Sequence, residues 1–360
     1  MAKNEHSPWW SWTWPLLAWA VLVLAVVLGP TDPIAAAAGF LLIAAVFAAV
    51  YHAEVVAHRV GEPFGTLILA VAVTIIEVAL IVSMMVGTSL DKSGLARDTV
   101  FAAVMIVCNG IVGLCLLVGG AHHREQGFQL AGASAALAVL GALTVLSLVV
   151  PNVTTTEPGP VFSTSQLVFA GAASLVLYGS FVFVQTVRHR DYFLPIDVGS
   201  TEEHAPPPSN RRALVSLGLL VVSLVAVVGL AKTLTPALEA GVAWLNAPKA
   251  VVGIVIAALV LLPEGMAAVK AARANQLQTS LNLALGSALA SIGLTIPAVA
   301  VVAIVLGQRL ELGLGGKEQL LLALTLFLGV VTLGTGRTTV LQGIVHLVMF
   351  AAFLFLAIVP

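Results

Sequence analysis

Two glutamates lie near the middle of long apolar stretches, where a charged side chain is costly. Glu77 is the one ionisable residue between positions 64 and 86, and Glu264 follows Pro263 in the apolar run 249–272. A bare carboxylate inside a bilayer is disfavoured by several kcal/mol, so a chain that keeps one commonly uses it to bind an ion or a proton. The alternatives are a protonated packing glutamate at 77 and a surface glutamate on a kinked helix at 264.

Threonines share the helix face of Glu77. Stepping back by three and four residues from Glu77 reaches Thr74, and the same face continues to Thr66. These positions coincide because an α-helix repeats every 3.6 residues. The spacing therefore predicts a polar track along an otherwise apolar helix, with Thr74 as a candidate cation ligand beside Glu77.

Neutral oxygens recur in the helices that follow each glutamate. Asn109 lies in an apolar run after Glu77, and Ser287, Ser291 and Thr295 repeat every four residues after Glu264. A single buried serine or threonine more often bonds its own helix backbone. Taken together with two carboxylates, these side chains predict a site of hard oxygen ligands, which suits Ca²⁺ or Na⁺ rather than a soft metal. The candidate ligands beside the glutamates are Thr74, Asn109, Ser287 and Ser291.

A histidine in the last apolar run is a candidate for proton transfer. His346 lies one turn after Gln342, and imidazole is the side chain that gains or loses a proton most readily near neutral pH. A packing histidine held by hydrogen bonds fits the sequence equally well. We therefore expect proton coupling to involve Glu77 and Glu264, with His346 as a further candidate.

Enzymatic chemistry is not indicated. Glu54 and His58 lie one turn apart, but their segment HAEVVAH lacks the HExxH spacing of zinc hydrolases. Neither a phosphate-binding loop nor a His–Cys cluster occurs in the chain. We therefore expect no catalytic residues and no cofactor, which argues against an intramembrane hydrolase.

The composition indicates a membrane protein. Hydrophobic residues make up 59% of the chain and charged residues 9%, both far from the averages of soluble proteins. The net charge of −1 gives no indication of a nucleic-acid partner. Cys108 and Cys115 lie seven positions apart on one expected helix, about 10 Å by helical rise, which is too far for a disulfide. The expected partners are the lipid bilayer, inorganic cations and protons.

Eleven apolar runs are long enough to be transmembrane helices. The first follows a tryptophan cluster of the kind found at membrane interfaces, which favours a retained helix over a cleaved signal peptide. The expected spans are 15–28, 34–57, 64–87, 98–120, 127–150, 164–187, 213–236, 249–272, 279–307, 318–335 and 339–359.

A polar connector divides these spans. Residues 188–212 are rich in proline and charge, which predicts a flexible linker. It separates five spans from five, and halves with odd numbers of spans must insert in opposite orientations. That arrangement is typical of inverted-repeat secondary transporters. The expected domains are the tail and first helix (1–32), one repeat (33–187), a cytoplasmic linker (188–212) and a second repeat (213–360).

Proline and glycine flank the second glutamate directly. The sequence Pro263-Glu264-Gly265 combines a residue that removes a backbone donor with one that tolerates open backbone. Such a trio inside a membrane helix predicts a broken helix whose freed carbonyls face a cation.

The distribution of basic residues predicts the orientation. Ten lysines and arginines fall on the side that holds the N-terminus and the linker, and six fall on the other side. Because cytoplasmic loops are enriched in these residues, the N-terminus is expected in the cytoplasm and the C-terminus outside.

Three segments of the chain resemble a known family. The stretches GEPFGTLILAVAVTIIEVALI, LLPEGMAAVKAARANQLQTSLNLALGSALASIGLTIP and GRTTVLQGIVHLVMFAAFL together resemble the bacterial ChaA-type cation/proton antiporters. These belong to the calcium/proton exchangers of the Ca²⁺:cation antiporter superfamily. The resemblance implies eleven helices in two inverted repeats, one acidic ion-site residue per repeat at Glu77 and Glu264, and a place in the bacterial inner membrane. The chain departs from the usual Gly-Asn-Ala-X-Glu pattern at both glutamates.

The predicted function is proton-coupled antiport. Two opposed glutamates can carry two protons or one Ca²⁺, and the exported ion is expected to be Ca²⁺, with Na⁺ and K⁺ as further candidates. The alternatives are an exchanger driven by Na⁺ and a passive cation channel. A channel, however, does not require a carboxylate in each half of an inverted repeat.

Overall fold

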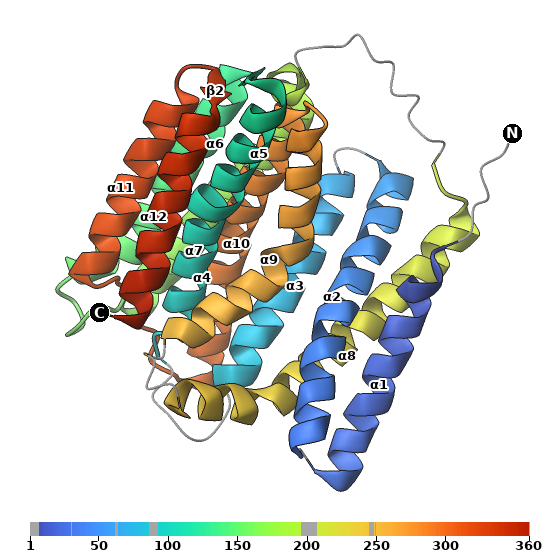
Figure 1. Cartoon of the computed structure of the whole chain (residues 1–360). Helices are drawn as coiled ribbons and strands as arrows, with labels where there is room; N and C mark the ends of the chain where they lie inside the picture. The colour runs from blue at the N-terminus through green and yellow to red at the C-terminus, as the bar shows by residue number, and fades with distance from the viewer. Residues whose placement is uncertain are drawn as a thin grey trace, which may run out of the picture. The chain divides into compact units, whose positions relative to one another are not determined.

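Every apolar run of the sequence forms a helix in the computed structural model (Figure 1). The structure describes residues 7–29, 31–61, 64–85, 93–195, 207–244, 248 and 250–359. The α-helices are α1 (Trp9–Leu28), α2 (Asp32–Val60), α3 (Phe64–Met85), α4 (Leu95–Met105), α5 (Val112–His123), α6 (Leu130–Thr144), α7 (Thr164–Phe183), α8 (Asn210–Trp244), α9 (Ala250–Arg273), α10 (Leu277–Leu306), α11 (Gly316–Leu333) and α12 (Val340–Ile358).

The prediction of an all-α polytopic membrane protein is confirmed. Across the described ranges, ten helices are long and apolar enough to span a membrane, and α3 contributes a shorter apolar segment, Leu67–Ser83. The whole of α3 has 22 residues, enough to cross a bilayer. Helices dominate because a helix satisfies its own backbone hydrogen bonds, which lipid cannot do.

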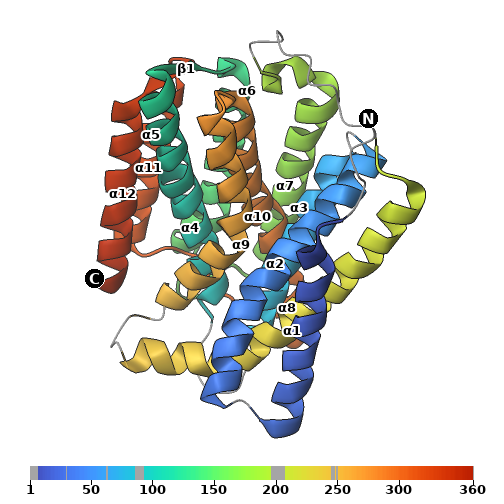
Figure 2. The same ribbon diagram turned by 45° about the vertical axis from the view of Figure 1, so that its right-hand side comes forward.

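Helices α1, α2, α3 and α8 form one compact unit, made of Met1–Gly87 and His204–Asn246. Within it, α2 packs along α8, and α1 packs against both (Figures 1 and 2). The Trp19 indole donates to the carbonyl of Val222 over 3.1 Å, which joins α1 to α8. The first helix is thus an integral part of this unit.

The remaining helices form a second unit, made of Thr88–Glu203 and Ala247–Pro360. Its helices pair across the two halves of the sequence: α5 packs along α12, and α7 packs along α10. In span order, the third helix of each predicted repeat thus pairs with the fifth helix of the other. Each compact unit takes elements from both halves of the chain, so the units are not the predicted repeats.

Two short strands, which the sequence analysis did not predict, join loops of the second unit. Strand β1 (Glu125–Gly127) pairs antiparallel with β2 (Arg337–Thr339), with Gln126 opposite Thr338. The buried Gln126 side chain donates to the carbonyl of Ala272 over 2.9 Å. The loop between α5 and α6 is thereby fastened to the C-terminal end of α9.

The expected break in the second glutamate helix is wrong. Helix α9 continues through Pro263, Glu264 and Gly265, and its ribbon bends without a gap (Figure 2). Proline removes a single backbone donor, and packed membrane helices tolerate that loss. The structure therefore offers no unwound stretch of carbonyls beside Glu264.

The predicted linker is folded at its start. Residues Arg190–Phe193 form a turn of 3₁₀ helix, and the buried Phe193 ring meets Phe181 edge to face. The Asn282 side chain donates to the carbonyl of Phe193 over 2.6 Å. The expectation of flexibility is therefore wrong for this part, whereas positions 196–206 lie outside the described residues.

Candidate ion-binding and proton-coupling sites

Glu77 and Thr74 are both buried on α3, in the first unit. The same helix leaves Val71 and Ile75 exposed, so burial follows the helical period that the sequence shows. Glu77 has a relative exposure of 1%, which makes it the more enclosed of the two glutamates. The Thr66 side chain, the other member of the predicted track, lies outside the described residues.

Glu264 lies half-buried on α9, in the second unit. The Ser287 hydroxyl, on α10, donates a hydrogen bond to Glu264 Oε2. Ser291 and Thr295 are also buried, one and two turns further along α10. The structure thus brings Glu264 and Ser287 together, as the oxygen-ligand prediction requires, and it places Ser291 on the same helix.

A tyrosine that the sequence analysis missed accompanies this pair. Tyr178 of α7 is buried and lies against α10, the helix that carries Ser287. It approaches α10 closely because Gly293 has no side chain: a Cβ there would lie 2.6 Å from Cβ of Tyr178. The only sequence signal for it is a polar aromatic residue in an apolar run, which does not indicate a partner.

Asn109 and His346, predicted separately as a cation ligand and a proton carrier, belong to one buried hydrogen-bonded chain. His346 Nδ1 lies 3.1 Å from Asn109 Oδ1, and His346 Nε2 lies 3.1 Å from the hydroxyl of Thr332. Asn109 Nδ2 donates to the Thr325 hydroxyl over 2.9 Å. Because Oδ1 can only accept, the imidazole carries its proton on Nδ1, and in the neutral ring Nε2 accepts from Thr332.

This buried cluster of Asn109, Thr325, Thr332 and His346, which we call the amide–imidazole cluster, joins three helices. Both polar atoms of Asn109 already have protein partners. Oδ1 has two lone pairs and uses one of them to accept from His346. The cluster is suited to transmit a change at one helix to the other two.

A π-helical segment positions Asn109. Residues Ile106–Ile111 form one π-helical turn between α4 and α5, and such turns are frequent at functional sites. Helix α12 then approaches α5 at Gly113, where a Cβ would lie 2.9 Å from Cβ of His346. The wider turn and the missing side chain together bring the amide and the imidazole within hydrogen-bonding distance.

Thr325 and Thr332 were also missed by the sequence analysis. They lie seven positions apart on α11, and this spacing places both on one helix face. That periodicity was the available signal. Gln342, by contrast, caps α12: its Oε1 accepts from the backbone N–H of Thr339 over 2.9 Å.

Histidine and carboxylate groups elsewhere do not assemble into a metal centre. Among the described residues, no group of three or more histidine, cysteine, aspartate or glutamate side chains could hold a metal ion. His52 Nε2 lies 2.8 Å from the carbonyl of Ser11, which explains its burial on α2. Glu54 is exposed on the same helix.

Two curated relatives match nearly the whole chain. The putative ionic transporter y4hA of Sinorhizobium fredii is 54% identical, and the match covers 99% of this chain and 98% of the relative. The sodium-potassium/proton antiporter ChaA of Escherichia coli is 37% identical, over 98% of this chain and 96% of the relative.

Solved structures share the fold at low identity. The structure of native YfkE matches with a TM-score of 0.74 at 15% identity and covers 97% of this chain and all of that chain. The H⁺/Ca²⁺ exchanger CAX matches with a TM-score of 0.70 at 12% identity, over 96% of this chain and 88% of that one.

A family model described as sodium/calcium exchanger protein matches residues 34–187 and again residues 215–359. These two segments cover most of the chain and leave out the first helix and the polar connector. With relatives at this level of identity along the whole length, the chain belongs to the sodium/calcium exchanger protein family, a family of membrane cation exchangers.

Proposed function

We propose that the chain is a proton-coupled antiporter that exports Ca²⁺, with Na⁺ and K⁺ as further exported ions. The observation that carries the proposal is one enclosed carboxylate on a membrane helix in each half of the sequence. Glu77 is buried on α3, and Glu264 accepts a hydrogen bond from Ser287 beside α9. Proton coupling is supported by the 37% identical relative, which is named a sodium-potassium/proton antiporter.

The coupling follows from charge balance at a site shared by the two glutamates. With two protons, or with one Ca²⁺, a site made of Glu77 and Glu264 is close to neutral. With neither, two carboxylates would repel each other in a medium of low dielectric constant. The empty state is therefore unfavourable, which discourages the transporter from changing sides without cargo.

Alternating access requires two elements that move against each other. We propose two inverted five-helix repeats at 33–187 and 213–360, joined by the cytoplasmic linker 188–212. The two matches of one family model, at 34–187 and 215–359, support this division. The reciprocal pairing of α5 with α12 and of α7 with α10 also fits two related halves.

His346 is the proposed additional proton carrier. Its Nε2 has the Thr332 hydroxyl as partner, and a hydroxyl can rotate from donor to acceptor when the ring takes up a proton. Protonation would then change the hydrogen bonds of the whole amide–imidazole cluster. His346 would thereby link proton uptake to the packing of α11 and α12.

A Na⁺-driven exchanger is the second candidate, because the matching family model is described as sodium/calcium exchanger protein. The decisive experiment uses purified protein in sealed liposomes that contain a pH-sensitive dye. In Na⁺-free buffer with an imposed pH gradient, addition of Ca²⁺ or K⁺ should release protons from the acidic lumen. If ion movement instead required Na⁺ and left the dye unchanged, the Na⁺-driven alternative would replace the proposal.

We further propose that the protein lies in the bacterial inner membrane with its N-terminus and its 188–212 linker in the cytoplasm. This orientation rests on the ten-to-six distribution of lysine and arginine. A cysteine placed in the linker, with Cys108 and Cys115 replaced by alanine, should not react with an impermeant reagent added to intact cells. Strong labelling from outside would reverse the orientation.

A further inference from the structure

A cavity of about 510 Å³ lies in the second unit, away from Glu264 and its partners. Helices α4, α9, α11 and α12 contribute to its wall. Its lining includes three buried apolar side chains, Phe101, Leu321 and Phe353. The Phe101 and Phe353 rings meet edge to face, with their centroids 5.6 Å apart, and both are buried.

The floor of this cavity lies directly next to the amide–imidazole cluster. Met105 follows Phe101 by four residues on α4, and Thr325 follows Leu321 by four residues on α11. Four residues are one helical turn, about 6 Å of rise. The Met105 sulfur is 3.4 Å from the Thr325 hydroxyl and thus marks the near edge of the cluster.

On α12 the cavity residue follows the cluster residue in the sequence, which is the reverse of the order on α4 and α11. Phe353 lines the cavity, Phe350 lies against Gly110 of the π-helical turn, and His346 belongs to the cluster. Three helices therefore place a cavity residue about one to two turns from a cluster residue.

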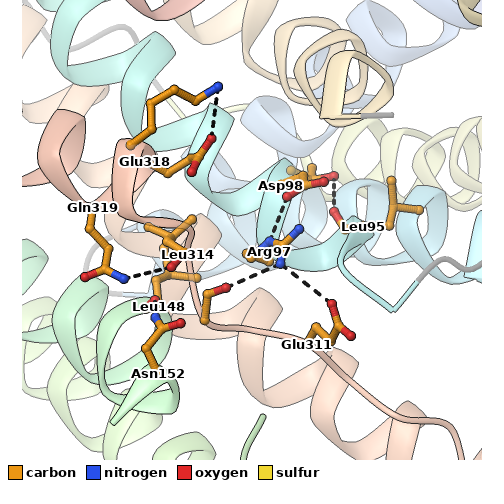
Figure 3. A network of polar contacts seen from close by, with 12 residues as sticks. Leu95, Arg97, Asp98, Leu148, Asn152, Glu311, Leu314, Glu318 and Gln319 are labelled. Atoms are coloured by element: carbon orange, nitrogen blue, oxygen red, sulfur yellow. Dashed lines mark hydrogen bonds and ion pairs between the residues drawn. The ribbon is translucent and has the colours of Figure 1, made fainter. Parts of the chain in front are cut away.

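The mouth of the cavity carries charges of both signs. The Arg97 guanidinium lies 2.8 Å from the Asp98 carboxylate and 3.8 Å from that of Glu311, as Figure 3 shows. Lys317 lies 3.4 Å from the carboxylate of Glu318. Four of these residues line the cavity, Arg97, Asp98, Lys317 and Glu318, so the described part of its lining carries two acidic and two basic side chains, and Glu311 lies outside the lining.

Both cationic groups are also engaged by backbone oxygens. Arg97 donates to the carbonyl of Gly313 over 3.3 Å, and Lys317 donates to the carbonyl of Leu356 over 2.8 Å. Their positive charges are thus held against protein acceptors. The described charged groups of the lining are thus held by protein partners, and together they form a polar entrance to the cavity.

We propose that this cavity is an access vestibule for water and small solutes to the amide–imidazole cluster, and that Phe101, Leu321 and Phe353 form a hydrophobic gate between the two. A narrow apolar constriction can exclude water until its side chains move apart. In the orientation proposed above, the vestibule opens to the outside of the cell. Its use in exchange rests on the proposed function, whereas the vestibule and gate themselves do not.

The test measures thiol access in purified protein, without any transport assay. In a background with Cys108 and Cys115 replaced by alanine, single cysteines are introduced by Leu321→Cys at the gate, Thr325→Cys beyond it and Leu322→Cys as control. Leu322 is buried on α11 outside the cavity wall. Each is combined with the natural Phe353 or with Phe353→Ala, and labelling rates with a small cationic thiosulfonate are compared.

We expect Phe353→Ala to accelerate labelling of the Thr325→Cys protein at least several-fold, with no change for Leu322→Cys. Phe353→Leu, which keeps most of the apolar volume, should give a smaller acceleration and serves where the alanine variant does not fold. Equal rates with and without the substitution, or an equal acceleration at Leu322→Cys, would overturn the gate.

The charge of the reagent tests the vestibule. In the Leu321→Cys protein, Glu318→Gln should lower the labelling rate with the cationic thiosulfonate relative to the rate with an anionic analogue, because Glu318 lines the cavity. An unchanged ratio of the two rates would contradict entry of the reagents past Glu318. Because neither measurement requires ion exchange, failure of the vestibule and failure of the antiport proposal are distinguishable.

Discussion

The second unit contains two helix pairs of the same kind with different chemistry. Where α5 meets α12, Gly113 admits His346, and where α10 meets α7, Gly293 admits Tyr178. Both contacts join the third helix of one predicted repeat to the fifth helix of the other. In both pairs, a glycine on one helix thus makes room for a polar ring of the other helix.

The two helix pairs differ in the surroundings of their polar rings. His346 belongs to a cluster whose polar atoms are paired by protein groups, and both Asn109 and His346 have at most 1% exposure. Tyr178 lies against Gly293 of α10, the helix whose Ser287 donates a hydrogen bond to the half-buried Glu264. The first pair is enclosed by protein, whereas the second includes the helix that contacts a half-buried carboxylate. We infer that the first pair sets conformation and the second pair binds cargo.

The largest effect is expected from removing the charge of that carboxylate. Glu264→Gln should abolish cation-dependent proton movement in liposomes, because the amide can neither lose a proton nor balance a cation. Glu77→Gln should do the same if both glutamates share the site. Elution as a single symmetric peak in gel filtration would show that the variants remain folded. Normal exchange by either folded variant would remove that glutamate from the proposed mechanism.

The two glycine contacts should respond alike to added volume. Gly113→Ala and Gly293→Ala should each lower the free energy of unfolding by about 1–3 kcal/mol, because both helices must separate to admit a methyl group. Gly286→Ala on α10 is the matched control, since a Cβ there meets nothing within 4 Å. It should be neutral or stabilising by up to about 1 kcal/mol, as alanine is the better helix former.

Thermal unfolding in detergent, with all three variants in one buffer, measures these differences. A destabilisation of Gly286→Ala as large as that of Gly113→Ala would show that close packing is not the cause.

Removal of the His346 imidazole should lower the stability of the protein more than it lowers the affinity for cations. His346→Ala leaves Asn109 Oδ1 and the Thr332 hydroxyl without their partner, which should lower the free energy of unfolding by about 1–3 kcal/mol. Thr332→Val removes only one of the two bonds and should have a smaller effect. Cation affinity, measured by isothermal titration calorimetry on the folded variants, should change little. A large loss of affinity with unchanged stability would assign cargo binding to this pair instead.

The smallest effect is expected at the hydrogen bond that Ser287 donates to Glu264. Ser287→Ala should weaken cation affinity by about tenfold, because a hydrogen bond to a charged group contributes about 1.5–3 kcal/mol and a single neutral hydroxyl donor is expected at the lower end of that range. Protons and cations compete for the same oxygens, so affinity in both proteins should fall as the pH is lowered from 9 to 6. Calorimetric titrations at several pH values measure both effects. An affinity that does not depend on pH would separate proton binding from the cation site.

Local properties of the chain were predictable from the sequence. The eleven apolar runs became helices because length and apolarity suffice to specify a membrane helix. Burial of Glu77 and Thr74 on one face follows from the helical repeat. The family resemblance was also readable, since the stretches around Glu77 and Glu264 are specific, and it is confirmed by relatives along the whole chain.

Long-range partners were decided only by the tertiary structure. Asn109 and His346 are 237 positions apart, and neither residue's local sequence names the other as partner. The π-helical turn, the β1–β2 pairing and the roles of Thr325 and Thr332 likewise depend on contacts between distant helices. Pro263 shows the reverse case. Its local preference predicts a break, but the packing of α9 against its neighbours keeps the helix continuous, because tertiary contacts outweigh the loss of one backbone hydrogen bond.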